Sequence, residues 1–595
     1  MKLIRPVLLT LVLFTLFASA GTQRQCLGAS GNVNGSPTIR IVAFPSIPTP
    51  TPSPSPSPGP RATPTPTLKA TTTPQPTPSC KWFVASTGRA SGDGSFSKPW
   101  SLGYIARGSL GDFIDQVPPA AIKPGDDICL MDGIYRGLYR TAVNGTATAP
   151  IKIHPYPGAR VIIDDGTVWL DCVRNQPCVR PPDGRADTFT ISSQYTFVYG
   201  LEITNSNPNR TGARLGGIGI DQWGSGSKAF NNLIYDAGGL ISKNDLAANT
   251  EVYGNVGWNN GWDDRNTGLR QGGTGHGIYA ANRKGYFKAY DNIMVNGFGF
   301  GFHVYSAGTG ALNGVDIQGN VSADNGYWTR IKDSPYAPEG RTTANFLVGH
   351  RPISNFTFKN NFGFHREGRL GMNADLGYSS SVDNPGPGVV TDNAMVGGVT
   401  AVSRFSSLEV ERNFISTNWT LIDWTPPATR TRQTIDNQIY YFYGADCGKQ
   451  PFTEEISDAN GTLQENSISA ARWNAKGFDT HSVINRCGKR PTGVQVTVRP
   501  NAYDPNRANV MVNNFDKSPT ISLDLSAVLK VGDKFELRNV QDYFGTLAAS
   551  GTYQGPVSVN MNRLTVARPV GWTGAMIPSS GPDFGIFVLI KKALE

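Results

Sequence analysis

Charged side chains are scarce in this sequence, at 17% of 595 residues, and the first 79 residues contain no Asp or Glu. Coiled coils and long helical proteins are excluded, because they are rich in Ala, Glu, Lys and Leu. A formal charge of +9 would by itself suggest a polyanionic partner. However, six Lys and Arg residues before Cys80 carry +6 of it, which leaves 48 basic and 45 acidic groups. The charge therefore does not indicate a nucleic-acid partner.

Long hydrophobic runs are also missing, since no segment after residue 20 has 18 consecutive apolar residues. No membrane span is expected for that reason. The first 20 residues combine Lys2 and Arg5, an apolar run that ends at Phe17, and the cleavage pattern Ala18-Ser19-Ala20. These features predict a signal peptide over residues 1–20 and a secreted, extracellular protein.

The next segment, residues 21–79, is predicted to be a disordered linker. Between Pro45 and Pro78, 13 of 34 residues are proline, mostly alternating with Thr and Ser. Such a composition buries little apolar surface and favours an extended polyproline II chain.

Cysteine is infrequent, with seven residues in the chain. Secretion permits disulfides, and Cys172 with Cys178 is one candidate pair. Cys447 with Cys487 is a second, and one cysteine stays unpaired in a monomer. No cysteine spacing resembles a zinc site, so no structural metal is expected.

What the chain has instead is a repeat of short β segments that each end in an Asn step. From Asn232 to Asn413 the aligned asparagines are 23, 37, 28, 41, 32 and 20 residues apart. The shortest spacings suit one coil of a β-solenoid, and the longer ones require loops inserted at a corner. Asn tolerates the left-handed backbone of a sharp corner, and stacked amides can form a hydrogen-bonded ladder. We interpret these asparagines as structural.

Two stretches resemble the right-handed parallel β-helix superfamily of pectate-lyase-like proteins. The first runs from Gly92-Asp93-Gly94-Ser95 through Pro124-Gly125-Asp126-Asp127 and Asp132-Gly133-Ile134-Tyr135 to Tyr156-Pro157-Gly158, and the second is the β-Asn repeat. The resemblance covers about residues 80–430 and implies an all-β solenoid. It also implies a secreted carbohydrate-active protein, although the fold alone does not fix an activity.

The remaining chain divides into two predicted parts. Residues 490–595 contain several short β segments separated by turns such as Gly532-Asp533, which is typical of a β-sandwich. Residues 431–489 are then a connecting segment. One helix is expected between Ser101 and Val117.

Two neighbouring coils carry the strongest candidates for chemistry. The segments Gly275–Tyr279 and Gly301–Tyr305 align Ile278 with Val304. If those two side chains point inward, the period of two directs Tyr279, His303 and Tyr305 outward. We take these three residues and His276, which lies inward or at the corner, as candidate catalytic residues. Gly277 would leave room for a ligand beside His303.

Candidate substrate-binding residues surround this pair of coils. They offer charges for an acidic sugar or rings for stacking, and His350, His365, Trp258 and Trp328 are weaker candidates. The set is Arg283, Lys284, Asp221, Trp223, Lys243, Trp262 and Asp375.

These residues support three alternative functions. The first is a lyase that cleaves a uronic-acid-containing glycan by β-elimination, with Tyr, His, Lys or Arg as base and acid. It needs a positive group or a Ca²⁺ ion to neutralise the uronate carboxylate; no other cofactor is expected. The second is a glycoside hydrolase, with two carboxylates from Asp221, Asp263, Asp264 and Asp375. The third is a non-catalytic glycan-binding or surface protein. In each case the expected partner is a polysaccharide, predicted to be an acidic one, and the protein is expected to be a monomer.

Overall fold

The computed structural model describes residues 80–592, except for a set of loop segments. Those segments are 109–118, 167, 170–186, 209, 211–213, 216, 264–274, 307–309, 329–343, 367–370, 379–383, 418–420, 424–431, 444–450, 458–462 and 487. The predicted signal peptide and linker, and both candidate disulfides, lie outside the described residues. Cys80 and Cys129 form a disulfide that the sequence analysis did not propose.

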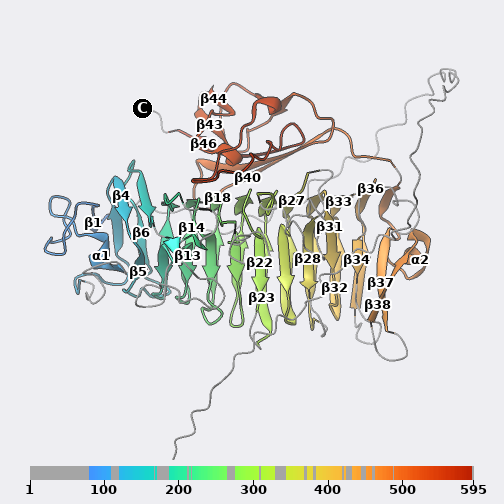
Figure 1. Ribbon diagram of the computed structural model, residues 1–595, viewed down its shortest axis with the longest axis horizontal. Coiled ribbons are helices and arrows are strands. Elements are labelled where there is room, and N and C mark those ends of the chain that lie inside the picture. The colour runs from blue at the N-terminus through green and yellow to red at the C-terminus, as the bar shows by residue number, and fades with distance from the viewer. Residues whose placement is uncertain are drawn as a thin grey trace, which may run out of the picture. The chain divides into compact units, whose positions relative to one another are not determined.

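Most of the described chain forms three long sheets, which we call A, B and C (Figure 1). The chain passes from sheet B to A to C and back to B, one strand per sheet in each coil. Neighbouring strands are parallel throughout A and C, and in sheet B all pairs are parallel except β2–β5 and β37–β38. Parallel crossover connections are right-handed in almost all proteins, which agrees with the coil sense implied by the sequence.

The strands of the three sheets are short and follow the coil repeat. Sheet A contains β1 (Trp82–Val84), β3 (Asp127–Leu130), β6 (Ile151–Pro155), β10 (Thr196–Tyr199), β14 (Lys228–Phe230), β17 (Thr250–Tyr253), β20 (Phe287–Tyr290), β23 (Leu312–Gln318), β26 (Ile353–Lys359), β29 (Gly388–Thr391), β32 (Ser407–Glu411) and β35 (Arg432–Asp436). Sheet C contains β4 (Gly133–Arg136), β7 (Val161–Asp164), β11 (Glu202–Thr204), β15 (Leu233–Tyr235), β18 (Val256–Trp258), β21 (Ile293–Val295), β24 (Val321–Ala323), β27 (Phe362–Phe364), β30 (Ala394–Val396), β33 (Phe414–Thr417), β36 (Ile439–Phe442) and β39 (Val483–Arg486). Sheet B contains β2 (Ala106–Gly108), β5 (Tyr139–Thr141), β9 (Phe189–Ile191), β13 (Ile218–Gln222), β16 (Gly239–Lys243), β19 (Ile278–Ala280), β22 (Phe302–Tyr305), β25 (Phe346–Gly349), β28 (Met372–Tyr378), β31 (Val399–Val402), β34 (Leu421–Asp423), β37 (Phe452–Ser457) and β38 (Leu463–Ile468).

Few other elements accompany the three sheets in the solenoid. Strands β8 (Val168–Trp169) and β12 (Arg214–Leu215) form a two-stranded ribbon. Helix α1 (Leu102–Ile105) begins where the sequence predicts a helix, but strand β2 follows at once, and the rest of that prediction lies outside the described residues. Helix α2 (Ala470–Ala475) buries Trp473 at the last coil.

The asparagine ladder is confirmed at the corner between sheets A and C. The side-chain oxygen of each Asn accepts hydrogen bonds from both the backbone N–H and Nδ2 of the Asn one coil earlier. Asn255, for example, donates from N and Nδ2 to Asn292 Oδ1 at 3.0 and 2.9 Å. The ladder connects Asn232, Asn255, Asn292, Asn320, Asn361, Asn393 and Asn413. It continues to Gln438, whose Oε1 accepts from Asn413 N at 2.7 Å.

The solenoid extends further than the sequence analysis expected. Residues 431–489, which we treated as a connecting segment, supply β35, β36, β37 and β39 of the same three sheets. The ladder continues here with Gln in place of Asn, so a pattern based on Asn stops one coil too early.

The C-terminal region is all-β, as predicted. A five-stranded antiparallel sheet contains, in order, β40 (Val494–Pro500), β41 (Arg507–Asn514), β46 (Phe584–Lys591), β43 (Lys534–Asn539) and β44 (Ala549–Thr552). A two-stranded sheet pairs β42 (Thr520–Leu523) with β45 (Val557–Asn560), and two short 3₁₀ turns are η3 (Val540–Asp542) and η4 (Met561–Arg563). Its classification as a β-sandwich stays a prediction.

The C-terminal region is joined to the outer face of sheet C by an apolar core. Val256, Ile293 and Val321 of the solenoid share this core with Met511 and Val588. A buried ion pair within the solenoid also binds the C-terminal region. Arg210 Nη2 lies 2.6 Å from Asp236 Oδ1, and that oxygen also accepts from the backbone N–H of Val570 at 3.0 Å. No helix in the described part of the chain is long and apolar enough to cross a bilayer.

We predict that Asn292→Ala lowers the free energy of unfolding by about 3 kcal/mol, because it removes four buried hydrogen bonds to Val252, Asn255 and Asn320 and leaves the backbone N–H of Asn255 without its acceptor. Urea unfolding measures the change. The control is Asn562→Ala, an exposed asparagine outside the ladder, which should change stability by less than about 0.5 kcal/mol. Equal effects of the two substitutions would contradict a stabilising role of the ladder.

Candidate functional site

The outer face of sheet B brings the candidate catalytic residues together. Tyr279 on β19 pairs with His303 on β22, and the same row runs from Ser242 to Leu347 and Asp375. Side chains of alternate residues, such as Ile278 and Phe302, point into the buried core. The outward direction predicted for Tyr279, His303 and Tyr305 therefore agrees with the register.

The alignment of the two coils was wrong by two residues. Ile278 pairs with Phe302 and not with Val304, so Tyr279 lies beside His303 rather than Tyr305. A shift of two keeps every side chain on its face, which is why the outward set is still correct. Gly277 does not make room for a ligand: a Cβ there would lie 2.3 Å from Gly301 O, so packing between coils requires glycine.

Six rings form one continuous group that we call the imidazole cluster. His303 is surrounded by four of them, with ring centroids 4.5 Å from His276, 4.7 Å from Phe300, 4.7 Å from Tyr305 and 5.3 Å from Tyr279. His350 stacks on Tyr305 at 4.3 Å and extends the cluster along the sheet. His276, Tyr279, His303, Tyr305 and His350 are each half-buried.

Burial keeps the central imidazoles neutral. It lowers the pKa of His303 well below 6.5, and the nearby His276 and His350 lower it further. Burial also lowers the pKa of His276 to about 4. The Nδ1 atoms of both rings are buried and have no hydrogen-bond partner among the described residues. Both rings are therefore unprotonated at neutral pH.

The two phenols next to His303 have the opposite property. Burial raises the pKa of Tyr279 and of Tyr305 above 10, so both remain protonated and can donate a proton. The cluster thus places the neutral imidazole of His303 in direct contact with two protonated phenols, those of Tyr279 and Tyr305. An unprotonated base and protonated acids are the starting states that general acid–base catalysis uses.

Two carboxyl groups occupy the same face closer to the N-terminal end. Burial and the adjacent Asp187 carboxyl raise the pKa of Asp221, which is hydrogen-bonded to Asp187 and Ser242. The indole N–H of Trp223 donates to Asp221 and fixes a ring that is 37% exposed. Trp223 is thus held where a sugar could stack on it.

The other predicted binding residues are distributed differently. Lys243 does not belong to the outer row: it pairs with Ala280 on the inward side, is 1% exposed, and has a pKa that burial lowers to about 7. Arg283 lies at the corner between sheets B and A and forms an ion pair with Asp245, and Lys284 beside it is exposed. Trp262 is 7% exposed at the corner between sheets C and B.

Asp375 is on the predicted face but far from Asp221. The row passes from β13 through β16, β19, β22 and β25 to β28, so five strand spacings of about 4.8 Å separate the two carboxyls by about 24 Å. Asp263 is buried, and Asp264 lies outside the described residues. No three His, Cys, Asp or Glu side chains gather as metal ligands in the described part of the chain.

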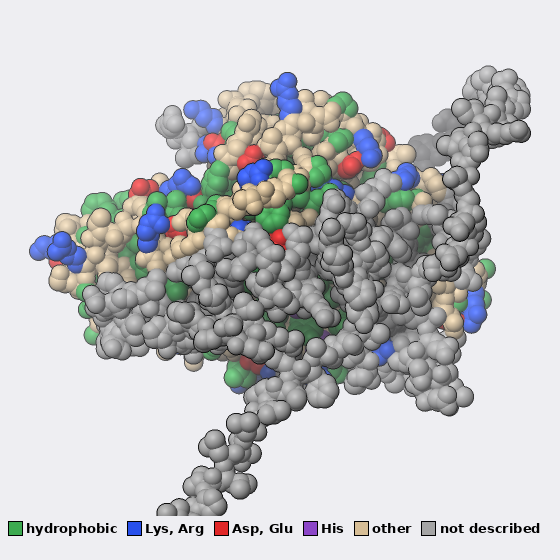
Figure 2. All heavy atoms as spheres, in the orientation of Figure 1, with side chains coloured by type: hydrophobic (Ala, Val, Ile, Leu, Met, Phe, Trp, Pro, Cys, Tyr) green, Lys and Arg blue, Asp and Glu red, His purple; other side chains and the backbone are tan. Residues whose placement is uncertain are grey.

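Sequence reasoning missed three residues of the site. Phe300 stacks on His303, Asp187 shares hydrogen bonding with Asp221, and the charge of Arg351 acts on Tyr305 and His350. Arg351 directly follows His350, so it could have been found by examining the residues next to each candidate histidine. Phe300 and Asp187 precede their strands and carry no periodic signal. On the face in Figure 2, described Lys and Arg side chains are interspersed with Asp and Glu.

The stacked coils define a parallel β-helix protein, as the resemblance implied. A pectate lyase, Pel9A, aligns with 57% of this chain and 76% of its own at 17% identity and a TM-score of 0.33. XylC in complex with xylose aligns with 80% of this chain and 99% of its own at 9% identity and a TM-score of 0.33. An alginate lyase from Paenibacillus sp. str. FPU-7 aligns with 54% and 92% at 16% identity and a TM-score of 0.29.

TM-scores this low transfer no activity, substrate or residue to this chain. No protein-family model and no curated protein matches it.

We predict that His303 and His276 do not titrate near pH 6.5, since burial disfavours the imidazolium. NMR of the ¹³C-histidine-labelled protein checks this, with the two signals assigned from His303→Gln and His276→Gln. Both rings should stay neutral down to a pH well below 6.5. A midpoint at or above 6.5 for His303 would contradict the neutral cluster.

Proposed function

We propose that the protein is a secreted polysaccharide lyase that cleaves a uronic-acid-containing glycan by β-elimination on the outer face of sheet B. The observation that carries this proposal is the neutral imidazole of His303 between the protonated phenols of Tyr279 and Tyr305. Elimination needs a base and an acid close together, and it needs no pair of carboxylates.

The proposed reaction balances within the cluster. His303 accepts the proton from the carbon α to the uronate carboxylate, and the electrons of that C–H bond form a C=C bond to the β-carbon. The bond from the β-carbon to the glycosidic oxygen breaks, and Tyr305 donates its phenolic proton to that oxygen. Transfer of the proton from His303 back to Tyr305 through solvent restores both groups.

A positive charge against the uronate carboxylate is also required. Arg351 is our candidate because its charge acts on both Tyr305 and His350. Ca²⁺ was the alternative from the sequence. Asp187 and Asp221 supply only two side chains, whereas Ca²⁺ takes six to eight oxygen ligands, and no three His, Cys, Asp or Glu side chains gather as metal ligands among the described residues.

The hydrolase alternative fits the described residues less well. Its two carboxyls must lie about 5–9.5 Å apart across the scissile bond. Asp221 and Asp375 are about 24 Å apart by strand count, and Asp187 is in hydrogen-bond contact with Asp221. Neither pair has the required separation.

We predict that His303→Ala and Tyr305→Phe each lower kcat by about 10²- to 10⁴-fold, because each removes one proton-transfer group. The purified mature protein is incubated with a panel of acidic polysaccharides, and the ultraviolet absorbance of the new C=C bond is followed. The controls are His481→Ala and Tyr286→Phe, which change exposed residues away from sheet B. New reducing ends without absorbance would identify a hydrolase instead of a lyase. Binding of the polysaccharide without either product would identify a glycan-binding protein.

The pH dependence provides a separate prediction. The base must be neutral and the acid protonated, so kcat/KM should fall only below pH 6.5 on the acid side and only above pH 10 on the alkaline side. Initial rates across this range on the best polysaccharide give the profile. An acid limb with its midpoint above pH 6.5 would rule out His303 as the base.

A further inference from the structure

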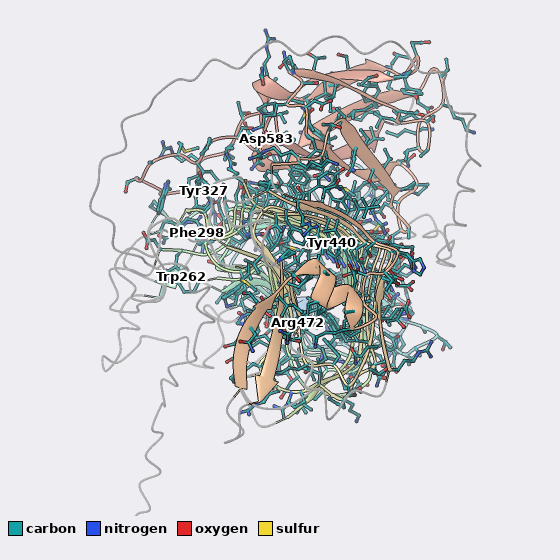
Figure 3. The ribbon with its side chains drawn as sticks, turned by 90° about the vertical axis from the view of Figure 1, so that its right-hand side faces the viewer. Trp262, Phe298, Tyr327, Tyr440, Arg472 and Asp583 are labelled. Atoms are coloured by element: carbon teal, nitrogen blue, oxygen red, sulfur yellow. A yellow bond between two sulfur atoms is a disulfide. The ribbon has the colours of Figure 1, made fainter. Side chains whose placement is uncertain are left out.

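The C-terminal region reaches the edge of the solenoid next to the imidazole cluster. Trp572, only 8% exposed, packs edge-on against Phe298 with ring centroids 5.3 Å apart, and it also contacts Trp328 at 5.7 Å. Figure 3 shows Phe298 at the same edge as Trp262 and Tyr327, where the chain leaves sheet C for sheet B.

The loop that carries Trp572 is held firmly in place. Asn259 Nδ2 donates to Ala567 O at 3.0 Å, Arg210 Nε donates to Val570 O at 3.2 Å, and Arg366 Nη1 donates to Ser579 O at 2.7 Å. The three donors come from three different connections between sheets C and B. The loop therefore has a fixed position against the corner between sheets C and B.

Phe298 lies between Trp572 and the cluster, two residues before Phe300. Its own N–H donates to Asn260 O at 2.8 Å, and the guanidinium of Arg210 lies 5.3 Å from its ring centroid. Phe300, two residues on, stacks on His303 and touches His276 at 5.3 Å. The intervening Gly299 is tightly enclosed, since a Cβ there would lie 3.0 Å from His276 Nδ1.

We propose that the C-terminal loop 566–580 is a positioning element of the candidate active site, and that Trp572 acts through Phe298 and Phe300 to hold the His276–His303 pair. The expected effect on kcat rests on the proposed function, whereas the positioning of the two imidazoles does not. Trp572 touches neither imidazole, so it is a positioning residue and not a catalytic one.

The consequence is clearest for the proton affinity of His303. The groups that face it are Phe300 from its own coil, His276 and Tyr279 from the coil before, Tyr305 on its own strand, and His350 from the coil after. The charge of Arg351 acts on Tyr305 and His350. If Phe300 loses its support, water gains access to the imidazole and the desolvation that lowers its pKa is reduced.

The test compares Trp572→Ala with Trp572→Phe in the full chain. The alanine variant should raise the NMR titration midpoint of His303 toward 6.5, and the acid limb of the rate profile should move with it. It should also lower kcat by about ten- to a hundredfold with KM changed less than about twofold. Trp572→Phe keeps an aromatic ring against Phe298 and should restore the midpoint.

Tyr553→Ala is the matched control, because Tyr553 is a buried aromatic residue of the same region that packs in its other core, away from Phe298. It should leave the His303 midpoint unchanged. An unchanged midpoint in a folded Trp572→Ala variant would overturn the proposal. If that variant does not fold, Phe298→Leu takes its place and an unchanged midpoint has the same meaning. A shifted midpoint in a protein without lyase activity would reject the proposed function and retain the positioning role.

Discussion

The stacking of one coil on the next is the constraint on which the rest of the structure depends. Each asparagine of the ladder donates from its backbone N–H and from Nδ2 to the side-chain oxygen of the asparagine in the following coil, as from Asn292 to Asn320. The ladder thus fixes the height and the register of that coil. Because each coil contributes one strand to each of the sheets A, B and C, the stacking fixed at one corner also determines which strands are neighbours in all three sheets. The neighbours of His303 on sheet B therefore depend on asparagines at the corner between sheets A and C.

The chemistry of the candidate site follows from burial more than from charge. Arg283, which was expected beside the cluster, is paired with Asp245 at the corner between sheets B and A. Instead, aromatic neighbours exclude water from His303 and lower its proton affinity, while the same exclusion raises that of Tyr305. One physical cause thus separates a proton acceptor from a proton donor within 4.7 Å.

Periodicity predicts a fold of this kind well and a site only in part. The alternation of side chains along a strand placed Tyr279, His303 and Tyr305 on one face, because every second residue of a strand points to the same side. The pairing between coils needed the true register, and glycines at positions 275, 277, 299 and 301 offer several equivalent alignments. Lys243 was misplaced for a related reason, since it follows Ser242, and the outward position belongs to the serine. Phe300 and Asp187 lie in connections, where spacing carries no information.

The last coils and the C-terminal region illustrate the same limit at a larger scale. Gln438 continues the ladder with one more methylene, and a pattern defined by Asn ends before it. In the sequence, the only sign that the outer face of sheet C is covered is the presence of apolar residues such as Val256, Ile293 and Val321. Polar residues are expected at these positions in a strand that faces solvent. Their burial under Met511 and Val588 explains both the composition and the position of the C-terminal region. The same region places its loop 566–580 against the adjoining corner, where Trp572 packs on Phe298 beside the imidazole cluster.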